Sequence, residues 1–215
     1  MKWIILILTM LVSEVTLSQT LKDIFLGIPD HFSMTRIQRD SLINNFLKKE
    51  TDGKGVGIQK HYLTRYDPRN GFLAFTGAYE GSTSMTFWNV SNGSKLIGIV
   101  SQSCGGACDN HIDFIKLSDG KYQQMPMGDI LPKLSFSDFM DVRRMEADRI
   151  DLERVKSIFN NYELLYHLPS KGKNITVESQ YHELDMDDKM KVYSLGSKIQ
   201  LIWQDGKFIK GGNMD

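Results

Sequence analysis

Apolar and polar positions alternate most clearly between residues 84 and 117. In STSMTFWNV, the side chains of Met85, Phe87 and Asn89 would point to one face and those of Thr86, Trp88 and Val90 to the other. This period of two predicts a β-strand. Asn92-Gly93 comes next and predicts a tight hairpin turn, because this pair tolerates positive φ angles. The returning run KLIGIVS is apolar on both faces. It therefore predicts an interior strand that is covered on each side.

The same period continues on both sides of this hairpin. The runs HYLTRY and FLAFTGAY are separated by turn residues at 67–71. A further strand at 112–115 is followed by the turn Ser118-Asp119-Gly120 and a returning run at 121–125. Together these runs predict an antiparallel meander.

Two stretches have helical spacing. Residues 35–49 carry an apolar stripe of Ile37, Leu42, Ile43, Phe46 and Leu47. Ser33 and Thr35 are both candidates for the N-cap of this helix. Residues 147–162 form the second amphipathic pattern. Between the meander and this second pattern, Pro126, Gly128 and Pro132 predict a connection near residues 126–134.

The second half of the chain is predicted to repeat the arrangement of the first, a helix followed by antiparallel strands. Strand-like runs follow the second helical pattern at ELLYHL, NITVES, KMKVYSL, KIQLIW and GKFIK. Gly196-Ser197-Lys198 echoes Gly93-Ser94-Lys95, which suggests the same hairpin in both halves. We expect an α+β fold made of tandem units, each a helix packed on an antiparallel β-sheet. The first unit spans residues 19–131 and the second spans 132–215.

The first residues have the pattern of a signal peptide. Lys2 precedes the apolar run WIILILTMLV, and Thr16-Leu17-Ser18 offers small residues for a signal peptidase. We expect residues 1–18 to be removed and the mature chain to begin at Gln19. This predicts an exported protein, periplasmic or extracellular. No cysteine follows the apolar run and the C-terminus is polar, so we expect a soluble protein with no integral membrane association.

Composition excludes some classes of partner. The chain has 215 residues, of which 41% are hydrophobic and 24% charged, as in an ordinary globular protein. Lys plus Arg and Asp plus Glu both total 26, so the balance of charge gives no reason to expect binding to nucleic acid or anionic lipid. The sheets are rich in aromatic residues, and those left uncovered by a helix would bind a protein, a peptide or a glycan.

Three segments carry a resemblance to a known family. They are DIFLGIPDHFSMTRIQRDSLINNF, KLIGIVSQSCGGACDNHIDFIKL and ILPKLSFSDFM. The chain resembles a family of uncharacterised exported proteins of Bacteroidetes-type bacteria. The resemblance implies a fold like that of the β-lactamase inhibitor protein, with helices packed on antiparallel sheet in tandem units. It implies no catalytic residues and no cofactor.

The most distinctive local feature is Cys104-Gly105-Gly106-Ala107-Cys108, followed three residues later by His111. In an exported protein, two cysteines four residues apart across flexible glycines most simply form a structural disulfide. Two alternatives use the same atoms. The reduced thiols could exchange electrons, or Cys104, Cys108 and His111 could bind zinc or copper.

Other chemistry has little support in the sequence. The remaining histidines show no metal-binding spacing, and no serine lies in a nucleophile-elbow motif. The acidic run Asp185, Asp187 and Asp188 is expected to be a solvated turn before a strand at Met190. The sequence thus favours a non-catalytic binding or interaction module over an enzyme. A thiol-redox or metal-binding protein is the alternative.

Overall fold

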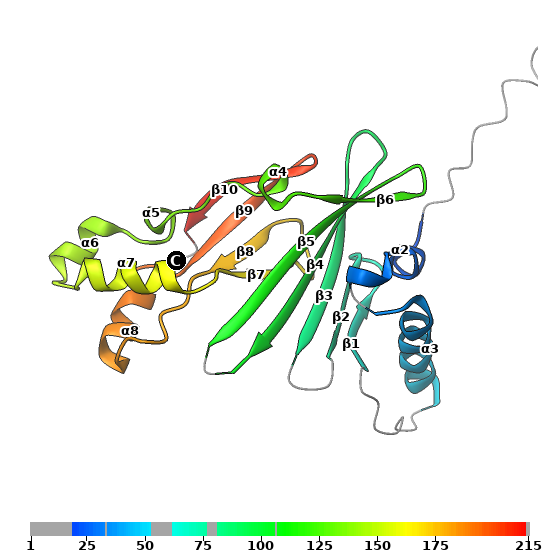
Figure 1. The fold of residues 1–215 in the computed structure, drawn as a ribbon, viewed down its shortest axis with the longest axis horizontal. Coiled ribbons are helices and arrows are strands. Elements are labelled where there is room, and N and C mark those ends of the chain that lie inside the picture. The colour runs from blue at the N-terminus through cyan, green and yellow to red at the C-terminus, as the bar shows by residue number, and fades with distance from the viewer. Residues whose placement is uncertain (1–18, 33, 53–61, 77–80, 106, 214–215) are drawn as a thin grey trace, which may run out of the picture.

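The fold consists of two antiparallel β-sheets with helices around them (Figure 1). The structure is a computed structural model that describes residues 19–32, 34–52, 62–76, 81–105 and 107–213. One sheet has six strands and the other has four. The expected α+β class is confirmed. The predicted signal peptide and the cleavage at Gln19 concern residues 1–18, which lie outside the described residues.

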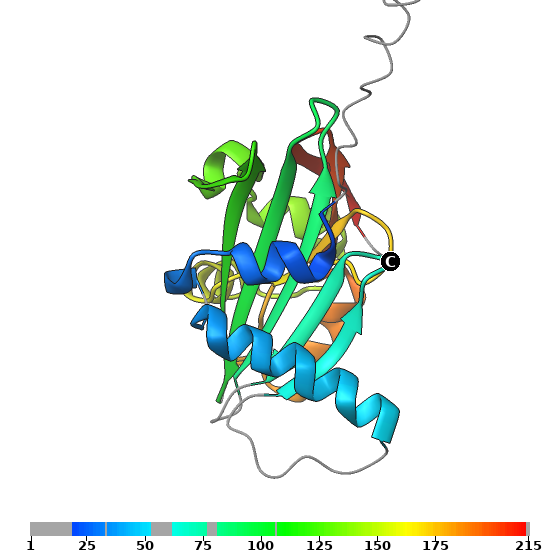
Figure 2. The ribbon, with the colours of Figure 1, turned by 90° about the vertical axis from the view of Figure 1, so that its right-hand side faces the viewer.

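The N-terminal helices cover one face of the larger sheet (Figure 2). They are α2 (Leu21–Gly27), the 3-10 helix η1 (Asp30–Phe32) and α3 (Arg36–Asp52). Thr35 is the N-cap of α3, because its hydroxyl accepts from the Gln38 backbone nitrogen while the Gln38 side-chain oxygen accepts from the Thr35 backbone nitrogen. The predicted helix is therefore present. The expected apolar stripe is wrong in part, since the side chain of Ile37 is 83% exposed and that of Leu47 is 40% exposed.

The six-stranded sheet is a simple meander, as predicted. Each strand pairs with the next in chain order. The strands are β1 (Tyr62–Asp67), β2 (Phe72–Thr76), β3 (Ser82–Asn89), β4 (Lys95–Cys104), β5 (Cys108–Ser118) and β6 (Lys121–Met125). Gly93 in the β3–β4 turn has a φ of 82°, which is the positive value that the Asn-Gly pair predicts.

β4 is buried on both faces. Ile97 and Ile99 pack with residues of α2 and α3 in one hydrophobic core. Leu96 and Val100 point to the opposite face, where they join a second core formed largely by the C-terminal half. The prediction that KLIGIVS is an interior strand is confirmed.

The C-terminal half lies against that second face of the meander (Figure 1). Its smaller sheet has the order β10-β9-β8-β7. Its elements are α4 (Met127–Ile130), α5 (Phe136–Phe139), α6 (Val142–Ala147), α7 (Leu152–Asn161), β7 (Leu165–His167), β8 (Ile175–Glu178), α8 (Met186–Ser194), β9 (Lys198–Gln204) and β10 (Lys207–Asn213).

The structure departs from four expectations for this half. The helix predicted at 147–162 is present but begins later, as α7, because α6 ends at Ala147, Arg149 takes a φ of 56° and the Asp151 side chain caps the new helix. The run KMKVYSL lies in α8, where the Asp185 carboxylate accepts from the Asp188 nitrogen as an N-cap. The acidic run is thus the start of a helix. Gly196-Ser197-Lys198 consequently follows a helix, so the echoed hairpin is absent.

An aromatic cluster joins the two halves. The ring of Trp88 on β3 stacks on Trp203 of β9 at 5.6 Å between centroids and meets Phe208 of β10 edge-on at 5.1 Å. The Trp88 indole nitrogen donates to the Lys173 carbonyl oxygen at 2.8 Å. A Cβ on Gly98 would lie 2.9 Å from the Trp88 ring, so only glycine lets the ring lie flat on β4. The division at residue 131 stays a prediction, whereas the buried core is shared across it.

No helix within the described ranges is long and apolar enough to cross a membrane.

Candidate functional site

The two cysteines lie at the tip of the β4–β5 hairpin. They are opposite each other in the β-ladder, and their sulfur atoms are 2.15 Å apart, at disulfide-bond distance. Cross-strand partners project to the same face of a sheet. The sulfurs therefore project to the face that carries Val100 and Ile112, toward the C-terminal half.

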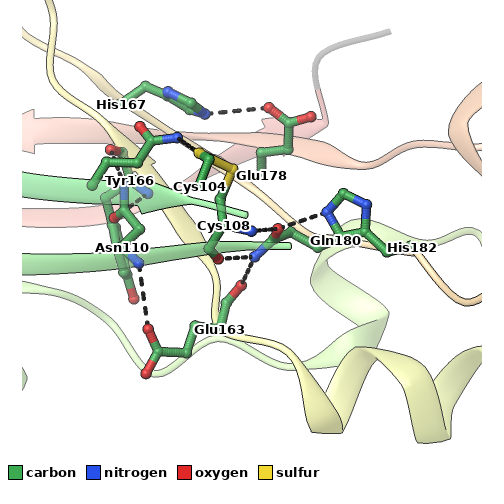
Figure 3. Close-up of a disulfide and its surroundings, with 10 residues drawn as sticks. Cys104, Cys108, Asn110, Glu163, Tyr166, His167, Glu178, Gln180 and His182 are labelled. Carbon is green, nitrogen blue, oxygen red and sulfur yellow. Dashed lines mark hydrogen bonds and ion pairs between the residues drawn. A yellow bond between two sulfur atoms is a disulfide. The ribbon is translucent and has the colours of Figure 1, made fainter. Parts of the chain in front are cut away.

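The side-chain amide of Gln180 holds the backbone of this tip (Figure 3). Its Oε1 accepts from the Cys108 nitrogen at 3.1 Å, and its Nε2 donates to the Cys108 carbonyl oxygen at 2.8 Å. The same Nε2 also donates to the Glu163 carbonyl oxygen at 2.9 Å. Gln180 is 3% exposed, so these bonds are shielded from water. The amide thus takes the place of a neighbouring strand beside Cys108.

Asn110 makes a similar connection two residues further along β5. Its Oδ1 accepts from the Tyr166 nitrogen at 2.9 Å, and its Nδ2 lies 3.4 Å from the Tyr166 carbonyl oxygen to which it donates. Its own backbone nitrogen donates to the Glu163 carboxylate at 3.4 Å. Asn110 is 5% exposed. Asn110 thus joins the tip of the larger sheet to β7, the edge strand of the smaller one, and Gln180 joins it to the segment just before β7.

The contact between His167 and Glu178 lies across the disulfide from Glu163 in the same view (Figure 3). His167 Nε2 and Lys198 Nζ each lie 3.2 Å from Glu178 Oε2. The hydrogen bond with His167 lowers the pKa of the Glu178 carboxylate; burial opposes this, and Lys198 adds to the lowering. The carboxylate is occupied by these contacts, which makes it a structural group that fixes β7, β8 and β9 together.

Between the amide contacts and β6, one edge of β5 is open. The β5–β6 ladder ends at the pair Phe114 and Met125, and the chain then leaves the sheet through Pro126 into α4. Because backbone groups of alternate residues face the same edge, the groups of Ile112 face outward in line with those of Phe114. The N–H and C=O of Ile112, and the C=O of Asn110, bond to no other described residue.

A groove of about 630 Å³ runs along this open edge. Apolar side chains of Met125, Met127 and Leu164 line it, and so do Asp113 and Glu163. Tyr166 also lines it. Burial raises the pKa of the Tyr166 phenol, and Glu163 raises it further, so the phenol is a neutral hydrogen-bonding group here. The groove combines unpaired backbone with apolar walls.

The structure does not bring the three proposed metal ligands together. His111 is an odd number of residues from Cys108, so strand alternation places the two side chains on opposite faces of the sheet. His111 Nε2 instead lies 3.3 Å from Asp113 Oδ2, and its side chain is 75% exposed. No group of three potential metal ligands occurs among the described residues. Ser101 lies opposite His111 in the ladder, yet no hydrogen bond joins their side chains.

The comparisons with known proteins identify the family. The family described as "Protein of unknown function (DUF3256)" matches residues 13–208. The chain belongs to this family. The expected relation to uncharacterised proteins is thereby confirmed, and the family's description assigns no activity to the site. Among curated proteins, no relative matches the sequence.

A solved structure shares the fold of this DUF3256 member. It is a domain of an uncharacterized protein from Porphyromonas gingivalis W83, a Bacteroidetes bacterium. The two superpose with a TM-score of 0.63 at 15% sequence identity, over 89% of this chain and 97% of that one. At this identity the likeness shows the fold alone.

The residues that organise this site in the DUF3256 chain were missed by sequence reasoning, apart from the cysteines. Gln180, Asn110 and Glu163 stand in no recognisable motif, and their partners are 53 to 72 residues away. Pro126 was the available signal. It marks the point at which the chain leaves the sheet, and beyond that point β5 has no neighbour on this side.

Replacing both cysteines with serine is expected to lower the free energy of unfolding by about 2 kcal/mol at most, because the closed loop is very short. The Gln180 and Asn110 bonds do not involve sulfur and should hold the tip in place. Urea denaturation followed by circular dichroism measures the change. Loss of the folded state at 25 °C in the double variant would show that the disulfide does more than close this loop.

Proposed function

We propose that this chain is a non-catalytic binding module that takes an extended peptide along the open edge of β5. The single observation that carries the proposal is the unpaired backbone of Ile112, together with the unpaired C=O of Asn110, beside the 630 Å³ groove. An extended peptide would continue the sheet where β6 leaves it. Main-chain hydrogen bonds would supply affinity, and the groove would select alternate side chains of the peptide.

The chemistry of the groove defines the peptide. One row of its side chains would contact Met125, Met127 and Leu164, which favours apolar residues at every second position. No Lys or Arg is among the described residues that line the groove, whereas Asp113 and Glu163 do line it. A peptide with a basic residue beside the apolar ones is therefore favoured over an acidic one.

The cellular location in this proposal comes from the signal peptide that the sequence predicts. Export, to the periplasm or the outside of the cell, supplies the oxidising environment in which a disulfide at Cys104 and Cys108 persists. A likeness to the fold of the β-lactamase inhibitor protein remains a prediction. Binding to nucleic acid and integral association with a membrane are not part of the proposal.

Selection from a phage-displayed library of random dodecapeptides tests it. The purified protein is expected to select peptides with alternating apolar residues and a basic residue. Met127→Arg should abolish their binding, because the new side chain fills the groove and repels a basic peptide. Met127 is 49% exposed, so the fold should be unchanged. Met186→Arg on α8 is the matched control, since Met186 is 72% exposed and does not line the groove.

Backbone methylation of a selected peptide distinguishes strand addition from other binding modes. Methyl groups at every second nitrogen should each weaken binding about three- to tenfold, since each removes one main-chain hydrogen bond. Methyl groups at the intervening nitrogens should have little effect. Calorimetry measures both series. Equal losses at all positions, or unchanged binding to Met127→Arg, would contradict the proposal.

A further inference from the structure

A second groove lies on the opposite face of the same strand ends, at the border of the N-terminal helices. Its volume is about 640 Å³. The ends of β3, β4 and β5 form its floor, and η1 with the start of α3 forms one wall. It shares Asn110, His111 and Glu163 with the first groove, but it does not include the open edge at Ile112. The two grooves therefore offer different chemistry on the two sides of β5.

The floor of this groove is a grid of polar side chains set by strand register. Thr83, Ser101 and His111 are cross-strand partners in one row, and Ser103 and Asp109 are partners in the next. Strand partners on adjacent strands lie about 5 Å apart, so the rows hold their groups at fixed spacing. The hydroxyls of Thr83, Ser101 and Ser103 form no hydrogen bond with another described residue.

Further along the same strands, this face of the sheet is apolar. Met85 and Ile99 occupy the preceding row of the same face, and both are buried with α2 and α3 in one core. The face becomes polar where the groove lies. Hydroxyl groups that cover part of a sheet face and keep their hydrogen-bonding capacity are suited to a ligand that brings donors and acceptors of its own.

The wall supplies an apolar aromatic surface. The rings of His31 and Phe32 lie 4.1 Å apart and are tilted by 40°. Phe32 is half-buried against the core below, so its ring is held in place. An aromatic ring next to hydrogen-bonding groups fits a pyranose, which has an apolar face of C–H groups and a rim of hydroxyls.

The charged residues that line this groove restrict the class of ligand further. None of the described residues that line this groove is Lys or Arg, whereas Asp109 and Glu163 are among them. An anionic ligand would meet these two carboxylates with no permanent positive charge in the lining, which holds His31 and His111 as its basic side chains. An apolar ligand would strip water from the hydroxyls without replacing their hydrogen bonds. A neutral, hydroxyl-rich ligand avoids both costs.

We propose that the groove between η1 and the ends of β3, β4 and β5 binds a neutral oligosaccharide. One sugar ring lies against Phe32, and its hydroxyls bond to Ser101, Ser103 and Asp109. This site differs from the peptide edge in the groups that would bind the ligand, although Asn110, His111 and Glu163 line both grooves.

Calorimetric titration of the purified protein tests the proposal. The probes are neutral di- to hexasaccharides of glucose, galactose, mannose and N-acetylglucosamine, with an oligosaccharide of uronic acids for comparison. At least one neutral series is expected to bind, and the uronic acid series is not. Ser101→Ala and Asp109→Asn should each weaken binding about three- to tenfold, as expected for one lost hydrogen bond.

Ser84→Ala is the matched control, because Ser84 neighbours Thr83 on β3 but projects to the other face and does not line the groove. It should bind the same probe with unchanged affinity. Met127→Arg should also leave saccharide binding intact, which separates this site from the peptide edge. Three results would overturn the proposal: no binding of any neutral probe at 10 mM, tighter binding of the uronic acid series, or unchanged affinity in both Ser101→Ala and Asp109→Asn.

Discussion

Replacing Arg39 with methionine is expected to lower the free energy of unfolding by about 3–5 kcal/mol. The Arg39 side chain is 1% exposed, yet its guanidinium is positively charged. It donates to the carbonyl oxygens of Met34, Leu26 and Ile28 and pairs with the Asp30 carboxylate at 3.0 Å. Methionine would fill most of the volume but leave these acceptors without a donor. Chemical denaturation followed by circular dichroism measures the loss.

Arg36→Met provides the control for this change. Arg36 begins the same helix, α3, and its side chain is exposed, so its loss should change stability by no more than about 0.5 kcal/mol. Burial lowers the pKa of the Arg39 guanidinium, and the charge of Asp30 opposes this. The positive charge is therefore destabilised by burial and stabilised by its contact with Asp30. Equal stability of the two variants would mean that the segment between α2 and α3 does not depend on Arg39.

Trp88→Ala is expected to cost about 3–5 kcal/mol, the usual range for a large buried aromatic residue. The substitution removes the rings' contact with Trp203 and Phe208 and leaves the Lys173 carbonyl oxygen without its donor. It also opens a cavity directly over Gly98. Because this cluster lies between the two sheets, the unfolding transition should move as a whole to lower denaturant concentration.

Tyr62→Ala is the control for aromatic content, since Tyr62 is 56% exposed on the edge strand β1. It should leave stability within about 0.5 kcal/mol of the parent. Unfolding of Trp88→Ala in two separate steps would contradict the expected single transition. It would show that the two halves keep their folds without the shared cluster.

The meander could be predicted almost completely from the sequence, because its pattern is local. Alternation, the Asn92-Gly93 turn and the doubly apolar run of β4 each determine the structure of residues that are close in the chain. The same reasoning was wrong for KMKVYSL. Its residues suit either state, and a cap at Asp185, four residues before the run begins, decided for helix.

The candidate site was predictable only in part. The cysteine tip was evident from spacing, and its position on a hairpin followed from the strands on either side. The contacts of Gln180 and Asn110 depend on how the two sheets pack, which the local pattern does not contain. The separation of Cys108 from His111, in contrast, could have been predicted from the sequence once residues 108–111 were assigned to a strand. Side chains an odd number of residues apart lie on opposite faces.

Because β4 is buried on both faces, its two faces are covered at different stages of folding. Residues up to Met125 complete all six strands of the meander, so this sheet can form from neighbouring segments as soon as they leave the ribosome. Its second face, with Trp88, Leu96 and Phe114, then waits for strands that are made last. Until β9 and β10 arrive, a broad apolar surface faces water. A chain truncated before Ile175 should therefore aggregate rather than persist as a folded half.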